Sequence, residues 1–193
     1  IINITVMSVI SIQTRNMALL SLLLVIAGGL LGFLKNNISP ARVFLGDGGS
    51  LMLGFFTSGT SIYLIETANT TGYGDLNSIV VIIAAILAVP VFDSLRVYLW
   101  RMSRGESPFK ADRTHLHHLF LVFGIDHKKT TLLICLLEII IVTTGFFFRN
   151  IATISLTILL ITVLFIAVGY LLQINSEVEK WLVRIRKMET EHE

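Results

Sequence analysis

The chain has 193 residues, of which 54% are hydrophobic and only 15% are charged, and its mean hydropathy is +0.80. This composition is far more apolar than that of a soluble domain, so it indicates an integral membrane protein. The net charge is only +2, and we expect a lipid bilayer and no nucleic acid among the partners. The single cysteine, Cys135, lies inside an apolar run and has no second cysteine in the sequence to pair with.

Apolar runs along the chain predict an all-α fold, a polytopic transmembrane helical bundle. A membrane-spanning helix needs about 20 mainly apolar residues. Five runs reach or approach that length, and a sixth covers only about half of it. The full spans are expected at 17–34, 50–65, 78–98, 130–148 and 151–172, and the partial span at 1–12.

Basic residues are distributed unevenly between the two sides of these spans. Of the 15 Lys and Arg residues, 13 fall on one side and only Arg15 and Arg149 on the other. The positive-inside rule makes the richer side cytoplasmic. The polar segments 35–49 and 100–129 are therefore expected to meet at the cytoplasmic face of a bacterial plasma membrane.

The end of the chain has a different composition from the spans. We place a transmembrane domain at 1–174 and a charged cytoplasmic tail at 175–193. Within this tail, apolar residues recur at helical spacing, which predicts an amphipathic helix that anchors at the membrane surface. They are Val178, Trp181, Leu182 and Ile185.

The first polar segment has a composition suited to holding a metal-bound phosphate. Its glycines, beginning with Gly46, allow a tight turn and close approach of a ligand. Ser50 is expected to cap a helix beginning at Leu51, and helix N-termini attract anions. Asp47 supplies the hard oxygen that Mg²⁺ prefers. The alternative is a plain turn followed by a helix cap.

The second polar segment gathers residues that bind phosphate or transfer protons. Arg113 can clamp a phosphate through two hydrogen bonds. His115, His117 and His118 can donate hydrogen bonds or transfer protons near neutral pH. A zinc site needs three or four converging ligands, which this spacing does not favour. The alternative is a solvated basic loop beside anionic lipid headgroups.

Asp93 is the third candidate, because it is an ionisable residue near the cytoplasmic end of a predicted span. Such residues are usually functional. The alternative is a helix-end salt bridge with Arg96, three residues further on. The sequence leaves both interpretations open.

Three motifs in this order carry a specific resemblance: A-R-V-F-L-G-D-G-G-S-L-M-L-G-F, P-V-F-D-S-L-R-V and S-P-F-K-A-D-R-T-H-L-H-H-L. They resemble the polyprenyl-phosphate N-acetylhexosamine-1-phosphate transferases, relatives of phospho-MurNAc-pentapeptide translocase. The resemblance covers most of the chain, about 17–121. H-L-H-H is more similar to the undecaprenyl-phosphate GlcNAc-1-phosphate transferase branch than to the translocase. The resemblance implies transfer of a sugar 1-phosphate from a UDP-sugar to polyprenyl phosphate, with GlcNAc as the favoured sugar. This reaction would begin the synthesis of an envelope polysaccharide such as O-antigen or teichoic acid.

The resemblance also implies roles for individual residues. Asp47 would bind Mg²⁺, or alternatively Mn²⁺, and Phe44 would stack on the uracil ring. Asn37 and Ser50 would line the nucleotide pocket. The substrate-binding set further includes Arg42, Gly46 and Asp93, and the residues expected at the diphosphate are Arg113, His115, His117 and His118.

One departure from the family is large, because the acidic D-D-x-x-[DN] motif and the D-G-x-D-G motif do not occur in the sequence. The chain therefore resembles the C-terminal half of such an enzyme, and we expect it to be inactive alone. Glycine-bearing helices would permit a homodimer. Two other functions stay open: a non-catalytic membrane scaffold, and a potassium-channel-like pore suggested by T-T-G-Y-G-D at 70–75.

Overall fold

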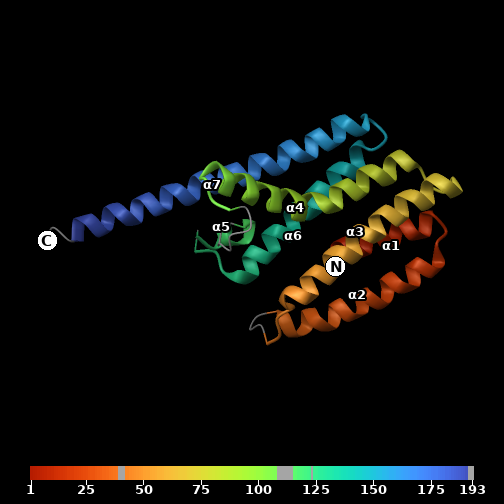
Figure 1. Ribbon diagram of the computed structural model, residues 1–193, viewed down its shortest axis with the longest axis horizontal. Helices are drawn as coiled ribbons and strands as arrows, with labels where there is room; N and C mark the ends of the chain where they lie inside the picture. Colours follow the sequence, from red (N-terminus) through yellow and green to blue (C-terminus); the bar gives the residue numbers. More distant parts are fainter. Residues whose placement is uncertain (39–41, 108–114, 123, 191–193) are drawn as a thin grey trace.

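The computed structural model describes residues 1–38, 42–107, 115–122 and 124–190, with the backbone alone for 176–190. Within these ranges every secondary-structure element is an α-helix, which confirms the predicted fold class (Figure 1). The helices are α1 (Ile2–Gln13), α2 (Met17–Asn37), α3 (Gly46–Thr71), α4 (Leu76–Ser103), α5 (Leu116–Val122), α6 (His127–Phe148) and α7 (Ile154–Thr190).

Four of the described helices are long and apolar enough to cross a membrane. They are α2, α4, α6 and the first part of α7, Ile154–Asn175. The chain is thus a multi-pass membrane protein. Four described helices meet the length and composition of a span, whereas five full spans were expected. The difference is α3, whose 26 residues have sufficient length but include many Gly, Ser and Thr. Helix α1 is apolar and short, as predicted for the partial span.

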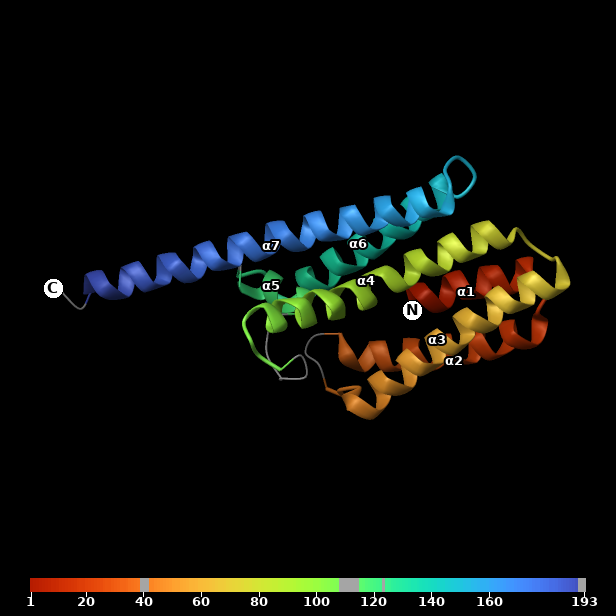
Figure 2. The same ribbon diagram turned by 45° about the horizontal axis from the view of Figure 1, so that its top comes forward.

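The helices place the two polar segments at the same end of the bundle. The α1–α2, α3–α4 and α6–α7 connections lie at one end, on the right of Figures 1 and 2. The start of α3, the end of α4 and the short helix α5 lie at the other end. Helix α7 continues past that end without a break to Thr190, so the predicted tail boundary at 174 falls inside a single helix.

Helix α4 is the central element, because it contributes to both apolar cores. Its Ile79, Ile83 and Ile86 pack with residues of α1, α2 and α3. Its Ala85, Ala88 and Val89 pack with residues of α5, α6 and α7. The second core therefore connects α5, which carries the histidine motif, to three long helices.

Close glycine packing occurs at a position that the sequence analysis did not single out. A Cβ on Gly145 of α6 would lie 3.0 Å from Ala85 Cβ of α4, so these helices cross at close range. By contrast, a Cβ on Gly28, Gly29 or Gly32 of α2 would meet nothing within 4 Å. These glycines therefore pack against no described neighbour.

The segment that resembles a channel filter is a connection between two helices. Gly72 ends α3 with a left-handed φ of 67°, and Asp75 caps α4 by accepting a hydrogen bond from the Ser78 amide at 2.9 Å. The Ser78 hydroxyl and amide together hold the pKa of Asp75 below its usual value. The turn and the cap account for the glycines and the aspartate of this segment.

Candidate active site

The first polar segment leads directly into α3. This helix begins at Gly46, whose φ of +68° suits glycine, and Asp47 lies in the first turn. The prediction that Ser50 caps a helix beginning at Leu51 is therefore wrong. The chain turns at Gly46, ahead of the Gly-Gly pair, so the Ser50 hydroxyl instead donates to the Asp47 carbonyl oxygen at 2.9 Å.

Asp47 presents an available carboxylate at this helix start. Its side chain is exposed and, among the residues that the structure describes, takes part in no hydrogen bond or ion pair. A negative charge in the first turn is favoured by the helix dipole. The carboxylate is thus free to accept a cation or a hydrogen-bond donor from outside the chain.

The residues before α3 include exposed side chains that are close in sequence to this carboxylate. Phe44 is 80% exposed, so its ring faces are accessible to another planar group. Arg42 is exposed, and its backbone amide donates to the Asn36 carbonyl oxygen at 2.9 Å. The Asn37 side-chain amide donates to the Val43 carbonyl oxygen at 2.9 Å. Asn37 therefore shapes this connection in addition to any contact with a ligand.

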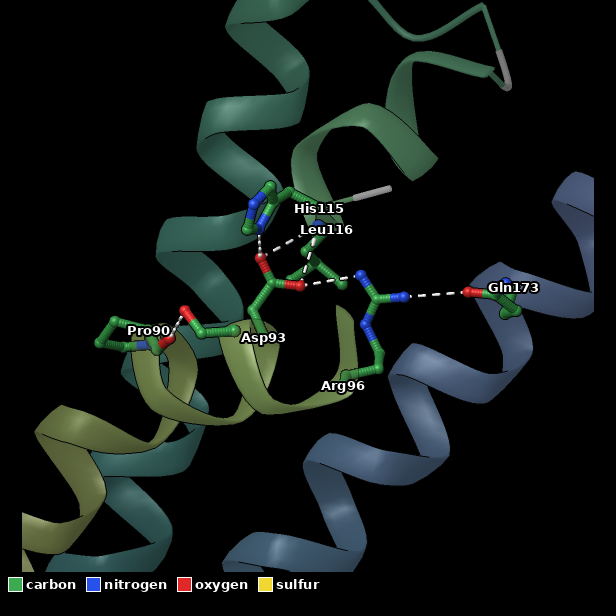
Figure 3. Close-up of polar contacts among 7 residues, drawn as sticks. Pro90, Asp93, Arg96, His115, Leu116 and Gln173 are labelled. Atoms are coloured by element: carbon green, nitrogen blue, oxygen red, sulfur yellow. Dashed lines mark hydrogen bonds and ion pairs between the residues drawn. The ribbon is translucent and has the colours of Figure 1, made fainter. Parts of the chain in front are cut away.

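The second cluster centres on Asp93, and Figure 3 shows its contacts. One carboxylate oxygen, Oδ1, accepts from Arg96 Nη2 at 2.9 Å and from the Leu116 amide at 3.0 Å. The other oxygen, Oδ2, lies 3.0 Å from His115 Nδ1 and also accepts from the Leu116 amide at 3.2 Å. The structure thus contains the salt bridge with Arg96 that the sequence offered as the alternative, together with a direct link to the histidine motif that the sequence did not indicate.

Asp93 caps α5 from a different helix. Leu116 is the first residue of α5, and its amide is one of the donors that a helix leaves unsatisfied at its start. An isolated helix of seven residues is unstable in water. Leu116 and Phe120 are buried in the core that α4, α6 and α7 share. The bundle therefore determines where the histidines lie.

The three histidines differ in their surroundings. His115 is 41% exposed, and because a carboxylate accepts hydrogen bonds, its Nδ1 carries the proton and leaves Nε2 available. The rings of His117 and His118 have centroids 3.8 Å apart at an interplanar angle of 39°. Partial burial, and then the neighbouring His118 and His115, lower the pKa of His117 below its usual value of 6.5. This favours neutral His117, a proton acceptor, near neutral pH.

Two groups of predicted site residues thus lie at the same end of the bundle. The group on the α3 side contains Asp47, Phe44 and Ser50, and the group on the α5 side contains Asp93 and the histidines. No described side-chain contact joins them, and Arg113 lies outside the described residues. Across the described ranges, no three His, Cys, Asp or Glu residues converge as a metal site.

Sequence reasoning missed Gln173 of α7. Its Oε1 accepts a hydrogen bond from Arg96 Nη1 at 2.9 Å, so it belongs to the same network as Asp93. The available signal was modest: Gln173 is a polar residue near the end of an apolar run, four residues after Gly169. This pattern is common near the ends of spans, and it does not by itself indicate a partner.

Comparison with known proteins shows which proteins this chain is similar to. A family model, "Glycosyl transferase family 4", matches residues 1–65. Together with the relatives below, this match confirms the resemblance seen in the motifs. No solved structure gives a significant match.

The relatives have consistent names. The chain is 31% identical over 180 residues to a "Probable undecaprenyl-phosphate N-acetylglucosaminyl 1-phosphate transferase" of Bacillus subtilis (strain 168), covering 93% of this chain and 48% of the relative. It is 35% identical to a "Decaprenyl-phosphate N-acetylglucosaminephosphotransferase" of Mycolicibacterium smegmatis, over 58% of this chain and 29% of the relative. It is 34% identical to an "Undecaprenyl-phosphate alpha-N-acetylglucosaminyl 1-phosphate transferase" of Pasteurella multocida, over 54% of this chain and 28% of the relative. The chain thus spans about half the length of the first of these relatives and less of the other two.

Proposed function

We propose that the full-length protein transfers GlcNAc-1-phosphate from UDP-GlcNAc to undecaprenyl phosphate and releases UMP. The proposed site lies at the cytoplasmic face of a bacterial plasma membrane, in agreement with the distribution of Lys and Arg. The proposal is supported by the names of the relatives. The structural observation that carries it is the Asp93 carboxylate, which fixes the histidine motif on a membrane-embedded bundle.

The proposed reaction is a phosphoryl transfer. An oxygen of the lipid phosphate attacks the β-phosphorus of the UDP-sugar and forms a new P–O bond. The bond from that phosphorus to the bridging oxygen breaks, and UMP leaves with this oxygen. Both reactants are anionic, so catalysis requires positioning and charge neutralisation more than a strong nucleophile.

Asp47 fits a role as a Mg²⁺ ligand. Mg²⁺ keeps several waters and is commonly held by one or two carboxylates together with substrate phosphates. A single exposed carboxylate without a partner in the described structure suits that arrangement, and Mn²⁺ would suit it equally. A bound ion would supply neutralisation of the diphosphate charge.

The other residues would bind and orient the substrates. The exposed Phe44 ring offers a face for the uracil, and Asn37, Arg42, Gly46 and Ser50 lie just before or within the first turns of the same helix. On the α5 side, His115 Nε2 and neutral His117 offer groups that donate or accept a proton at phosphate oxygens. We propose that Arg113, which is close to these histidines in the sequence, neutralises the remaining charge of the phosphates.

The proposal is tested with the complete gene expressed in membranes. Radiolabelled UDP-GlcNAc, undecaprenyl phosphate and Mg²⁺ are added, and label is followed into the lipid phase. We expect transfer that UMP reverses and chelation abolishes. Transfer from UDP-GalNAc alone would change the sugar and keep the reaction, whereas no transfer from any UDP-sugar by a folded protein would favour the scaffold.

A further inference from the structure

Arg96 joins two helices through a single guanidinium group. Its Nη2 donates to Asp93 on its own helix, α4, and its Nη1 donates to Gln173 on α7, both at 2.9 Å (Figure 3). The side chains of Arg96 and Asp93 are only 18% and 15% exposed. The contact is therefore mostly shielded from water, which strengthens it relative to a surface ion pair.

A glycine on α7 makes room for this arginine. A Cβ on Gly169 would lie 3.3 Å from Arg96 Cδ and 3.9 Å from Nε, so the arginine side chain lies against the backbone of α7. Gln173 follows Gly169 by four residues, which places both on the same face of the helix. One turn earlier on each helix, the rings of Phe92 and Phe165 pack with centroids 5.6 Å apart. Contacts between α4 and α7 thus recur at the same one-turn spacing on both helices.

The hydrogen bond to Gln173 of α7 restricts the orientation in which the Arg96 guanidinium group pairs with Asp93. An arginine three residues from an aspartate can pair with it in many side-chain conformations, and such a pair alone contributes little. A second hydrogen bond at the other end of the planar guanidinium restricts that plane. Asp93 Oδ1 then keeps a fixed partner, and Oδ2 stays directed at His115.

We propose that Gln173 and Gly169 are positioning residues of the candidate active site. Gln173 orients Arg96, Arg96 orients the Asp93 carboxylate, and that carboxylate caps α5 and holds His115. The catalytic consequence rests on the proposed function, whereas the positioning of α5 does not. The competing explanation is that the Arg96–Gln173 bond only holds α4 against α7.

The first test measures the position of α5 without turnover. Hydrogen exchange of peptides covering 115–122 is compared in the full-length protein carrying Gln173→Met, Gln173→Glu or the control Asn175→Met. Methionine keeps the size of glutamine but removes the acceptor, glutamate keeps an acceptor, and Asn175 is an exposed polar residue of the same helix. We expect exchange at the start of α5 to be about five- to tenfold faster in Gln173→Met alone, the effect of one lost hydrogen bond.

Equal exchange in Gln173→Met and wild type would overturn the proposal. Should Gln173→Met fail to fold, Gly169→Ala provides a second test, because its methyl group would lie 3.3 Å from Arg96 Cδ and push that side chain by a few tenths of an ångström while Gln173 is retained. A smaller acceleration at α5 is expected there, and unchanged exchange would overturn the proposal equally.

The second test links the position of α5 to catalysis. In the transfer assay, Gln173→Met should lower kcat about tenfold and change KM for UDP-GlcNAc less than about twofold. Gln173→Glu should restore kcat. Faster exchange with unchanged kcat would overturn the catalytic part of the proposal. If wild type transferred no sugar, the proposed function would fail, and the exchange measurement would still decide the positioning of α5.

Discussion

Replacing Asp93 with asparagine tests the central contact of the candidate site. The carboxylate has two accepting oxygens: Oδ1 accepts from Arg96, Oδ2 lies against His115, and the Leu116 amide is within hydrogen-bond distance of both. The asparagine side chain has a single accepting oxygen. Whichever way its amide is turned, either Arg96 or His115 therefore loses its acceptor. A hydrogen bond to a charged group contributes about 1.5–3 kcal/mol. We therefore expect kcat of the full-length enzyme to fall about 10- to 150-fold in Asp93→Asn.

The assay is label transfer into lipid, with the amount of folded protein measured in parallel. Glu66→Gln is the matched control, because it makes the same chemical change at an exposed carboxylate. Glu66 lies near the C-terminal end of α3, away from the candidate site. This control should retain nearly normal kcat. An Asp93→Asn enzyme whose kcat stayed within about twofold of wild type would refute the assignment, since the lost bond would then contribute less than about 0.5 kcal/mol.

Three further predictions concern the metal, the helix packing and pH. Asp47→Asn should lower kcat at least about 10²–10³-fold, equivalent to about 2.7–4 kcal/mol, and should weaken the response to added Mg²⁺ in the same assay. Gly145→Ala should destabilise the fold by about 1–3 kcal/mol, measured as a lower Tm, because its methyl group meets Ala85 of α4. Gly28→Ala, where the methyl group meets no described neighbour, should leave Tm unchanged. Because the pKa of His117 is lowered from 6.5, the unfolded state binds its proton more readily. Stability should therefore decrease as pH falls below about 6.5, and His117→Gln should flatten the dependence of Tm on pH in that range.

The apolar runs predicted most of the fold, because membrane spans are defined by length and composition. The predicted spans at 17–34, 78–98, 130–148 and 151–172 correspond to α2, α4, α6 and the first part of α7. The boundaries of α3 were not predictable in the same way. The predicted span ended at 65, but α3 continues to Thr71, and the hydroxyl groups of Thr67, Thr70 and Thr71 donate to carbonyl oxygens one turn earlier. These hydroxyl groups therefore have hydrogen-bond partners within the helix itself.

The candidate site was predictable residue by residue but not as a set of contacts. Asp93 and His115 each stood out in the sequence, yet 22 residues separate them, and nothing local indicates that they meet. The role of Gln173 depends on which helix packs against α4, which only the fold reveals. The metal role of Asp47 and the phosphate role of Arg113 stay predictions.

The short length of α5 explains why its position depends on the rest of the bundle. Seven residues form too few internal hydrogen bonds to be stable alone, so contacts from other helices supply the difference. Asp93 of α4 caps its first residue, and the core that holds Leu116 and Phe120 includes Ile141 of α6 and Phe165 of α7. A change in the packing of any of these three helices therefore reaches the histidines directly. For this reason, we expect substitutions in apolar positions of this core to alter kcat as well as stability, even though none of these positions is among the residues that we assign to the substrates.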